Sequence, residues 1–201
     1  MKIIIVDYDM GNIAALRNAI EYLNYNVKVS KNPKDISSAD FLIIPGVGAF
    51  KQAIKNIKNM NLFDQINEYI FIKKKFILGI CLGMQLLCEE SEEHGKTNGF
   101  KCVNLKLKKF KTKPNFHIGY NQVNFESPNI LFKNIKQNSD FYFVHSFRVK
   151  NSKLKNFTKS TSEYGEKFIS SFEKDNIFGT QFHPEKSQMN GLKLIKNFLS
   201  Q

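Results

Sequence analysis

Cysteine is scarce in this sequence, which limits the kinds of scaffold and site that the chain can form. The 201 residues contain three cysteines, Cys81, Cys88 and Cys102. An odd number of cysteines with no dense framework excludes a disulfide scaffold. No CxxC pair is present, and the four histidines are scattered without the pairing typical of zinc ligands. We therefore expect neither a metal site nor a cofactor.

Long apolar runs are also missing, and none approaches the length that spans a membrane. The opening apolar run is too short for a signal peptide, and Asp7 and Asp9 follow it directly. The modest counts of 5 prolines and 11 glycines, with 42% hydrophobic residues, are typical of a globular protein and not of a disordered or fibrous one. We expect a cytoplasmic protein, folded as a single domain over residues 1–201 and long enough to bury a core.

Acidic residues are outnumbered, with 18 Asp and Glu against 30 Lys and Arg, which gives a formal net charge of +12. Such a charge is compatible with nucleic acid, a membrane surface or an acidic protein partner. The lysines are, however, spread along the chain, and the densest groups, residues 73–75 and 106–113, sit at the edges of apolar segments. They lack the aromatic interleaving of an RNA-binding sheet and any DNA-reading motif. This pattern favours a basic, solvated surface and neither a nucleic-acid nor a membrane site.

Short apolar segments alternate with helical patterns in the first half of the chain. β-Branched and apolar runs predict buried strands at residues 2–7, 26–30, 41–44 and 76–80. Apolar residues at helical spacing predict helices over residues 13–23, 50–59, 62–71 and 84–88. Strands separated by helices indicate an α/β fold, with a central, mostly parallel sheet and helices on both of its faces.

The second half of the chain changes character, because its strand patterns follow one another without long helices between them. Strands are predicted at residues 102–110, 118–125 and 141–149. Residues 168–173 and 177–182 resemble a hairpin with its turn at Asp175 and Asn176, and residues 191–199 form a last amphipathic helix. We therefore expect an antiparallel extension of the sheet.

The strongest local motif is GICLG at residues 79–83, between a predicted strand and a predicted helix. It has the spacing of a nucleophile elbow, with Cys81 in the place of serine. With 11 glycines in 201 residues, glycine two places before and two places after one of three cysteines is expected about 0.009 times by chance. A cysteine at a helix N-terminus is favoured as thiolate, and the N–H of Leu82 would point toward an oxyanion. The alternative is a small buried cysteine packed in a turn.

A cysteine nucleophile needs a base, and the base needs a group that orients it. The sequence QFHPE at residues 181–185 follows a predicted strand. His183 is held by Pro184, and the carboxylate of Glu185, two residues later, could accept one imidazole N–H and leave the other nitrogen for Cys81. A lone histidine is more often structural. The HPE sequence together with the elbow favours a catalytic His183.

A glycine-rich turn, PGVGAF at residues 45–50, follows the third strand and opens a helix. It lacks the Lys-Ser/Thr ending and the glycine spacing of a phosphate-binding loop. Such a turn can instead supply backbone N–H donors beside the nucleophile. We favour oxyanion donation or substrate clamping over phosphate binding.

Taken together, these motifs resemble those of the class I (triad) glutamine amidotransferases, and the resemblance covers nearly the whole chain. The segments GICLGMQ and QFHPE are typical of that family. PGVGAF, HIGYNQV (residues 117–123) and HPEKS are more similar to the glutaminase subunits of imidazole glycerol phosphate synthases from histidine biosynthesis. The resemblance implies a class I glutamine amidotransferase-like fold. It also implies hydrolysis of glutamine through a cysteine thioester, with the ammonia channelled to a partner that makes imidazole glycerol phosphate and AICAR.

The resemblance also implies roles for individual residues. Cys81 would be the nucleophile, His183 the base and Glu185 its orienter. Backbone amides at Val47, Gly48 and Leu82 would form the oxyanion hole. The residues expected to bind glutamine are Gln85, Glu93, His145 and Ser146. In the family the partner is a (β/α)8-barrel cyclase subunit, and the residues that would face it in a heterodimer are Asn12, Tyr120 and Lys186.

Two departures from the family pattern lie on the expected partner side. Asp9 stands where the family usually has glycine, and Tyr120 stands where it usually has tryptophan. The alternative acceptor is therefore a sugar amidotransfer system for surface glycans, fed by a paralogous glutaminase. A binding module that kept the fold, a nucleic-acid-binding protein and a cysteine peptidase or thioester hydrolase are further alternatives. The intact Cys81, His183 and Glu185 argue against the binding module, and the matches at Gln85 and Glu93 argue against the peptidase or hydrolase. Salt-dependent binding to random DNA without glutamine hydrolysis would support the nucleic-acid alternative.

Overall fold

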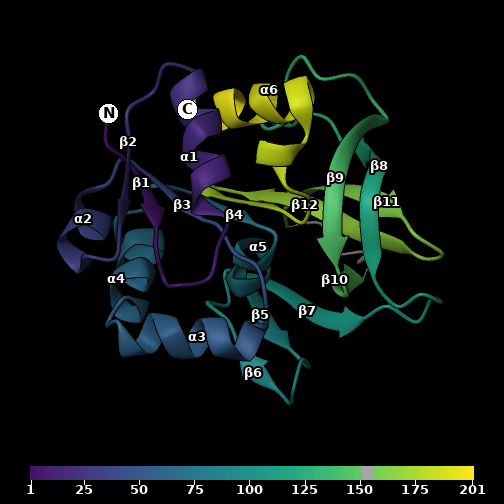
Figure 1. Cartoon of the computed structure of the whole chain (residues 1–201), viewed down its shortest axis with the longest axis horizontal. Coiled ribbons are helices and arrows are strands. Elements are labelled where there is room, and N and C mark those ends of the chain that lie inside the picture. Colours follow the sequence, from purple (N-terminus) through teal and green to yellow (C-terminus); the bar gives the residue numbers. More distant parts are fainter. Residues whose placement is uncertain (151–155) are drawn as a thin grey trace.

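Five parallel strands form the centre of the sheet in the computed structural model, which describes residues 1–150 and 156–201 (Figure 1). In spatial order they are β2 (Val27–Ser30), β1 (Ile3–Val6), β3 (Phe41–Ile44), β4 (Phe76–Ile80) and β13 (Ile177–Thr180). Each neighbouring pair is parallel. All five lie inside segments where the sequence predicts strands, so that prediction is confirmed.

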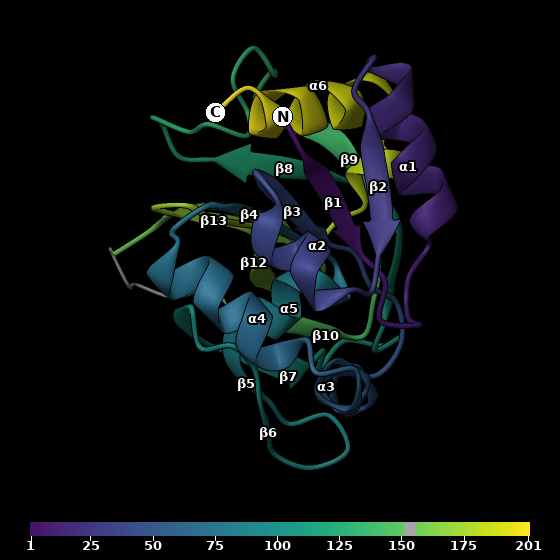
Figure 2. The ribbon, with the colours of Figure 1, turned by 90° about the vertical axis from the view of Figure 1, so that its left-hand side faces the viewer.

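Helices cover both faces of this parallel centre, as predicted (Figure 2). One face carries α1 (Ile13–Tyr22) and α6 (Gln188–Leu199). The other face carries α2 (Pro33–Ser38), α3 (Phe50–Asn59), α4 (Phe63–Asn67), which continues into the π-helical turn η1 (Glu68–Ile72), and α5 (Leu82–Leu87). None of the helices in the described residues is long and apolar enough to cross a membrane.

The central strands divide their side chains between two hydrophobic cores. In β1, Ile4 packs in the core on the side of α2 to α5, whereas Ile3 and Ile5 pack in the core on the side of α1 and α6. This division follows from the alternation of side chains along a strand. Because β1 and β3 are buried along their whole length, both faces require apolar residues. Burial of both faces is therefore the reason why these strands are uninterrupted apolar runs in the sequence.

The antiparallel extension predicted for the second half of the chain is also present, with one parallel pair in it, β5 (Cys88–Ser91) with β7 (Val103–Lys109). It continues the central sheet from β13 through β12 (Lys167–Lys174), β10 (Phe147–Lys150), β7, β5 and β6 (Thr97–Asn98). A branch adds β11 (Thr158–Glu163), β8 (His117–Phe125) and β9 (Ser139–His145), and Figure 1 shows β8 and β9 standing beside the main sheet. β12 and β13 form the predicted hairpin, with Asp175 at its turn in a left-handed conformation (φ 52°).

Residues 141–149 form two strands and not the single strand that the sequence predicts. The first, β9, pairs with β8, and the second, β10, pairs with β7 and β12. The chain changes partners at Ser146, whose carbonyl accepts a hydrogen bond from Phe110 N at 3.1 Å. Apolar periodicity indicates which residues of a strand are buried, but it does not identify the neighbouring strand. The sequence pattern therefore could not predict this break.

The short helix α2 was not predicted. α2 begins after Asn32, whose side chain accepts a hydrogen bond from Lys34 N, and Pro33 is its first residue. The Asn-Pro pair is a helix-start signal that the sequence contains. The helix predicted at residues 84–88 begins at Leu82 and ends at Leu87, because Cys88 opens β5.

Candidate active site

Cys81 lies at the sharp turn between β4 and α5. Its backbone has φ 54° and ψ −107°, a region that L-residues rarely adopt, and its N–H donates to Thr180 O at 2.7 Å. A Cβ at Gly79 would stand 2.5 Å from the carbonyl carbon of Gly83. A Cβ at Gly83 would stand 1.8 Å from Ile44 O. The two glycines are therefore required because strand, helix and neighbouring strand approach one another at the turn.

His183 follows β13 and is held beside Glu185 by a short turn. Residues Pro184–Lys186 form the 3-10 turn η2, which brings Glu185 Oε1 to 2.7 Å from His183 Nδ1. The side chains of both residues are almost completely buried, at 2% and 3% exposure. With its Nδ1 proton donated to the carboxylate, the ring keeps Nε2 for other chemistry. This Nε2 has no hydrogen-bond partner within the described residues.

The electrostatic surroundings of His183 favour its charged form. Burial lowers the pKa of His183, whereas the negative charges of Cys81 and Glu185 raise it, and the balance lies at about 10. The arrangement therefore favours an imidazolium at His183. The other two cysteines differ, since burial raises the pKa of both Cys88 and Cys102 well above the usual range. Both are buried thiols without an activating partner of this kind.

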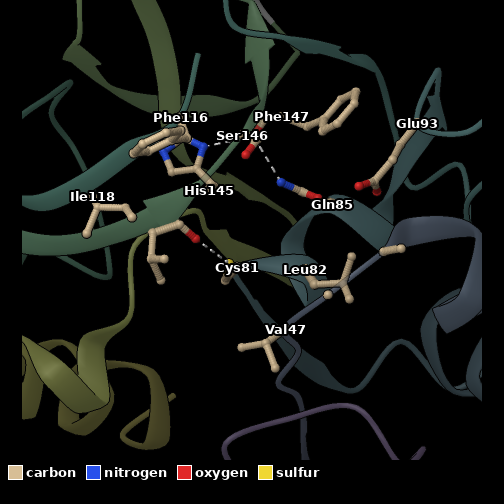
Figure 3. Close-up of a pocket in the computed structure, with 13 residues that line it drawn as sticks. Val47, Cys81, Leu82, Gln85, Glu93, Phe116, Ile118, His145, Ser146 and Phe147 are labelled. Atoms are coloured by element: carbon tan, nitrogen blue, oxygen red, sulfur yellow. Dashed lines mark hydrogen bonds between the residues drawn. The ribbon is translucent and has the colours of Figure 1, made fainter. Parts of the chain in front are cut away.

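A cavity of about 570 Å³ opens above Cys81. Figure 3 shows Leu82 and Val47 on one side of the sulfur and His145 across the cavity. Its wall comes from the glycine-rich turn, α5, the loop after β5, and strands β8 to β10. The lining residues are Val47, Gly48, Ala49, Cys81, Leu82, Gln85, Glu93, Phe116, Ile118, Val144, His145, Ser146 and Phe147. The structure thus brings together all the residues expected to form the oxyanion hole and to bind glutamine, while His183 and Glu185 are not part of the wall.

The glycine-rich turn packs tightly against the start of α5. A Cβ at Gly46 would lie 2.2 Å from the Tyr8 hydroxyl and 2.8 Å from Leu82 Cβ. The Tyr8 hydroxyl donates to Pro45 O at 2.5 Å and so holds the turn in place. Gly48 has φ +103°, a conformation that favours glycine. The first N–H groups of a helix, that of Leu82 included, have no acceptor inside the helix.

Gln85 and Glu93 each have one polar group engaged and another available to the cavity. Gln85 Nε2 donates to Phe147 O at 3.1 Å and to Gln181 Oε1 at 3.0 Å. Glu93 Oε2 accepts from Phe50 N at 2.7 Å. In Figure 3 the amide oxygen of Gln85 lies on the side of the Glu93 carboxylate. The two side chains therefore present oxygen atoms to the same end of the cavity.

His145 has both ring nitrogens paired. Its Nδ1 lies 2.8 Å from Phe147 O, and its Nε2 lies 3.2 Å from Nδ1 of His117. Burial lowers the pKa of His145 to about 3 and that of His117 to about 4. Both rings are therefore neutral near pH 7 and form part of the wall of the site. Pairing of His117 with His145 was not predicted, because the two belong to strands whose register the sequence does not give.

Five lining residues were not predicted: Ala49, Phe116, Ile118, Val144 and Phe147. A signal for two of them was present in the sequence. Phe116 and Ile118 alternate with His117 and point to the opposite side, and they are 44% and 59% exposed. An exposed apolar alternation of this kind marks an interaction surface or the mouth of a site.

The three residues expected at the partner face are all exposed or largely so. Asn12 precedes α1 and makes no side-chain cap. Tyr120 is 51% exposed, and its hydroxyl donates to Lys186 O at 2.8 Å. Lys186 Nζ in turn lies 5.6 Å from the centre of the Tyr142 ring. Tyr120 and Lys186 thus belong to one surface that joins β8 and η2.

The part of the chain that the structure describes offers no cluster of metal ligands. Residues 1–150 and 156–201 contain no group of three or more His, Cys, Asp or Glu arranged to hold a metal ion. All three cysteines are free thiols.

Comparisons with known proteins give matches that cover nearly the whole chain. The family model "Glutamine amidotransferase class-I" matches residues 4–201. A Campylobacter jejuni protein, "Imidazole glycerol phosphate synthase subunit HisH 1", is 43% identical over 98% of both chains. A Methanococcus maripaludis HisH 2 subunit is 44% identical over 99% of both chains.

Solved structures show the same fold. A putative GMP synthase subunit from Thermoplasma acidophilum superposes with a TM-score of 0.75 at 19% identity, covering 100% of this chain and 92% of that one. A second structure, that of a glutamine amidotransferase, gives a TM-score of 0.74 at 14% identity, covering 98% and 97%. At these identities the likeness concerns the fold alone.

Proposed function

Because the chain belongs to the class I glutamine amidotransferase family, we propose that it is the glutaminase subunit of an imidazole glycerol phosphate synthase in histidine biosynthesis. In this proposal it hydrolyses glutamine to glutamate and ammonia, and a (β/α)8-barrel cyclase subunit uses the ammonia to make imidazole glycerol phosphate and AICAR. The observation that carries the proposal is the elbow cysteine at the cavity, with a buried His183–Glu185 pair acting on it. The near full-length similarity to HisH subunits supports the choice of pathway.

In the proposed reaction the Cys81 thiolate attacks the side-chain amide carbon of glutamine. Backbone N–H groups of Leu82 and of the Val47–Gly48 turn stabilise the oxyanion. His183 gives its proton to the departing ammonia, which leaves a γ-glutamyl thioester on Cys81. The neutral ring then takes a proton from water, and the resulting attack releases glutamate and restores the thiolate and imidazolium. Glu185 keeps Nε2 as the reacting nitrogen throughout.

Substrate binding follows from the oxygens at the far end of the cavity. Glutamine carries an α-ammonium group, which requires hydrogen-bond acceptors and negative charge. We propose that Gln85 Oε1 and the Glu93 carboxylate supply them, because the other polar contacts of both side chains are made within the protein. Ser146 and His145 would form the wall opposite Cys81. With both nitrogens paired, His145 contributes its ring face and not a hydrogen bond.

The exposed mouth of the cavity supports the docking of a partner subunit. A partner that covers the mouth would keep the ammonia from escaping into solvent. Val47, Phe116 and Ile118 line the cavity and are between 43% and 59% exposed. Exposed apolar residues around a site are typical of a surface that another chain covers. We propose that this surface, with Asn12, Tyr120 and Lys186, meets the barrel subunit in a cytoplasmic heterodimer.

A sugar amidotransfer system for surface glycans is the alternative acceptor. The Asp9 departure gives it little support, because Asp9 has φ 63°, a left-handed conformation that both glycine and aspartate adopt. Tyr120 is the remaining departure on the partner side. Detection of imidazole glycerol phosphate after incubation with a barrel cyclase subunit distinguishes the two acceptors. A complex that forms only with a sugar amidotransferase would contradict the histidine assignment.

Replacing the sulfur of Cys81 with oxygen tests its proposed role as the nucleophile. Cys81→Ser should keep the fold, measured by circular dichroism and thermal unfolding, and should lose detectable glutaminase activity. Diazo-oxo-norleucine, a glutamine-like electrophile, should label Cys81 and leave Cys88 and Cys102 unmodified, as read by mass spectrometry of the peptides. Glutaminase activity that persists in folded Cys81→Ser would end the proposal.

A further inference from the structure

Gln181 is completely buried and lies directly beside the nucleophile, yet the proposed reaction gives it no role. Its side-chain amide nitrogen, Nε2, is 3.7 Å from Cys81 Sγ. Its amide oxygen, Oε1, accepts a hydrogen bond from Gln85 at 3.0 Å. A buried amide has a definite orientation only if its partners impose one. Neighbouring groups must therefore keep the donating end of this amide turned to the sulfur.

A chain of hydrogen bonds that ends at Gln181 begins at Asn121 on β8. Backbone groups fix the orientation of the Asn121 amide, because its Oδ1 accepts from Gln122 N at 2.8 Å and its Nδ2 donates to Glu163 O at 2.8 Å. The same Nδ2 lies 3.2 Å from His117 Nε2. That ring nitrogen must therefore be the acceptor, and in a neutral ring the proton resides on Nδ1.

The proton positions of the second histidine follow from its own backbone partner. His145 Nδ1 lies 2.8 Å from Phe147 O, which can only accept, so Nδ1 carries the proton. Its Nε2 is then bare and accepts from His117 Nδ1 at 3.2 Å. The assignments made from the two ends agree. Each donor in the chain faces an acceptor, provided that both rings are neutral.

Phe147 O connects the histidine pair to the amides beside the nucleophile. A carbonyl oxygen accepts two hydrogen bonds, and this one receives His145 Nδ1–H and Gln85 Nε2–H, the latter at 3.1 Å. Gln85 is thereby fixed with its nitrogen toward Phe147, and its second N–H donates to Gln181 Oε1. Because the amide oxygen of Gln181 is turned toward Gln85, its amide nitrogen faces Cys81 Sγ.

We propose that Gln181 is a positioning residue that holds the Cys81 sulfur by an N–H donated to it. The carbonyl oxygen of Phe147 orients Gln85 and, through it, Gln181, and the His117–His145 pair holds this carbonyl in place. The inference rests on the proposed role of Cys81 and adds to it an N–H donor for the sulfur, which also lies 3.8 Å from the carbonyl oxygen of Val144. An N–H donor favours the thiolate over the thiol, because the charged sulfur is the better acceptor. The titratable groups near Cys81 are His183, whose pKa the charge of Cys81 raises against the effect of burial, and Tyr8, which stays neutral because burial and the charge of Cys81 raise its pKa well above the usual range.

The test is the pH dependence of Cys81 alkylation by iodoacetamide in the full-length chain, followed on the Cys81 peptide by mass spectrometry. The midpoint is the pH at which the alkylation rate of Cys81 reaches half of its maximum, and it reports thiolate formation in the coupled Cys81–His183 pair. Gln181→Met, which has a similar volume and no N–H, should raise the midpoint by about one pH unit, since a hydrogen bond to a charged group has roughly this effect. Gln181→Glu keeps the acceptor for Gln85 but turns a carboxylate oxygen to the sulfur, so it should raise the midpoint further.

His145→Phe tests whether the histidine pair matters, and it should raise the midpoint by less than Gln181→Met does. Gln52→Met on the exposed face of α3 and His94→Gln in an exposed loop are matched controls and should leave the midpoint unchanged. A purely structural role for Gln181 would lower the melting temperature without moving the midpoint.

Two results would overturn the proposal, in whole or in part. An unchanged midpoint in folded Gln181→Glu would remove the role of Gln181, and an unchanged midpoint in His145→Phe would remove the dependence on the histidine pair. Because alkylation does not require turnover, these results are separate from a failure of the glutaminase assay, which would instead reject the proposed function.

Discussion

At the residue scale, the backbone of the site is held in conformations that only certain side chains permit. Cys81 is kept at φ 54° by the contacts of two glycines, and the closest of these is the approach of Gly83 to Ile44 O. Strain of this kind persists only where the surrounding structure enforces it. The turn at Cys81 therefore depends on the lack of a side chain at Gly79 and Gly83 as much as on the side chains around it.

Gly83→Ala is expected to destabilise the protein by about 2–3 kcal/mol, because the new Cβ would overlap the backbone of β3. Urea denaturation measures the loss, and glutaminase activity should fall with it. Gly11→Ala is the control, because its Cβ would meet Pro45 Cγ at 3.3 Å, a contact that a side chain can relieve. A Gly83→Ala protein as stable as the Gly11→Ala protein would contradict this account.

Asp9 has a left-handed backbone, and this predicts how the position responds to substitution. Asp9→Gly should change the free energy of unfolding by less than about 0.5 kcal/mol, because glycine adopts positive φ freely. Asp9→Val should cost about 1–2 kcal/mol, because a β-branched residue is disfavoured there. Chemical denaturation of the two variants side by side checks the difference, and equal stability would show that the conformation at Asp9 is not retained.

The neutral histidine pair predicts a dependence of stability on pH. His145 has an ordinary pKa of 6.5 when unfolded and about 3 when folded, so its contribution to stability is complete above pH 6.5 and is lost as the pH falls from 6.5 toward 3. His117 acts in the same direction down to about pH 4. Between these limits the unfolded chain binds protons that the native protein does not.

His145→Phe should therefore flatten the plot of unfolding free energy against pH between 6.5 and 4, by up to about 1.4 kcal/mol per pH unit. His94→Gln, an exposed histidine, should leave the slope unchanged. Denaturant titrations at four or five pH values measure both slopes. An unaltered slope in His145→Phe would mean that His145 is not neutral in the native protein.

At the scale of elements, α3 depends on a residue from a distant loop. Its N-cap, Ala49, offers no side-chain acceptor, and the N–H of Phe50 is instead satisfied by Glu93. A carboxylate at this position also interacts favourably with the helix dipole. The same side chain lines the cavity, so the start of α3 and the proposed ammonium site share one residue.

Glu93→Ala is expected to cost about 1–2 kcal/mol of stability and to raise the KM for glutamine, whereas Glu93→Gln should lose less stability because it keeps an acceptor. Glu92→Ala is the matched control. Among the described residues, the Glu92 carboxylate forms an exposed ion pair with Lys108, worth less than about 1 kcal/mol. Thermal unfolding and steady-state kinetics separate the two effects, and an unchanged KM in Glu93→Ala would reject the ammonium role.

The elements also show how far sequence patterns reach. β3, β4 and α3 have the predicted bounds, because a buried strand or an amphipathic helix carries its signal in its own residues. The break at Ser146 and the strand β11 were missed. In these cases the deciding factor is the identity of the neighbouring strand, which periodicity along one strand does not encode.

At the scale of the whole molecule, the open cavity and its exposed apolar mouth predict that activity depends on a partner. Isolated, the subunit should hydrolyse glutamine slowly, and kcat should rise when the barrel cyclase subunit binds. Tyr120→Ala, at the surface shared with Lys186, should weaken this stimulation without changing the basal rate. Glutaminase assays with and without the barrel subunit provide the measurement. A basal rate equal to the rate in the complex would contradict the prediction.

The sequence alone determined the nucleophile elbow, the HPE segment and the parallel centre of the sheet. Glycine spacing, an apolar run and a helix start are local properties, and the chain records them in consecutive residues. Only the tertiary structure decided that His117 meets His145, that Glu93 caps α3 and that Gln181 faces Cys81. These contacts join residues between 28 and 100 positions apart, and they depend on strand order and register, which no local pattern specifies.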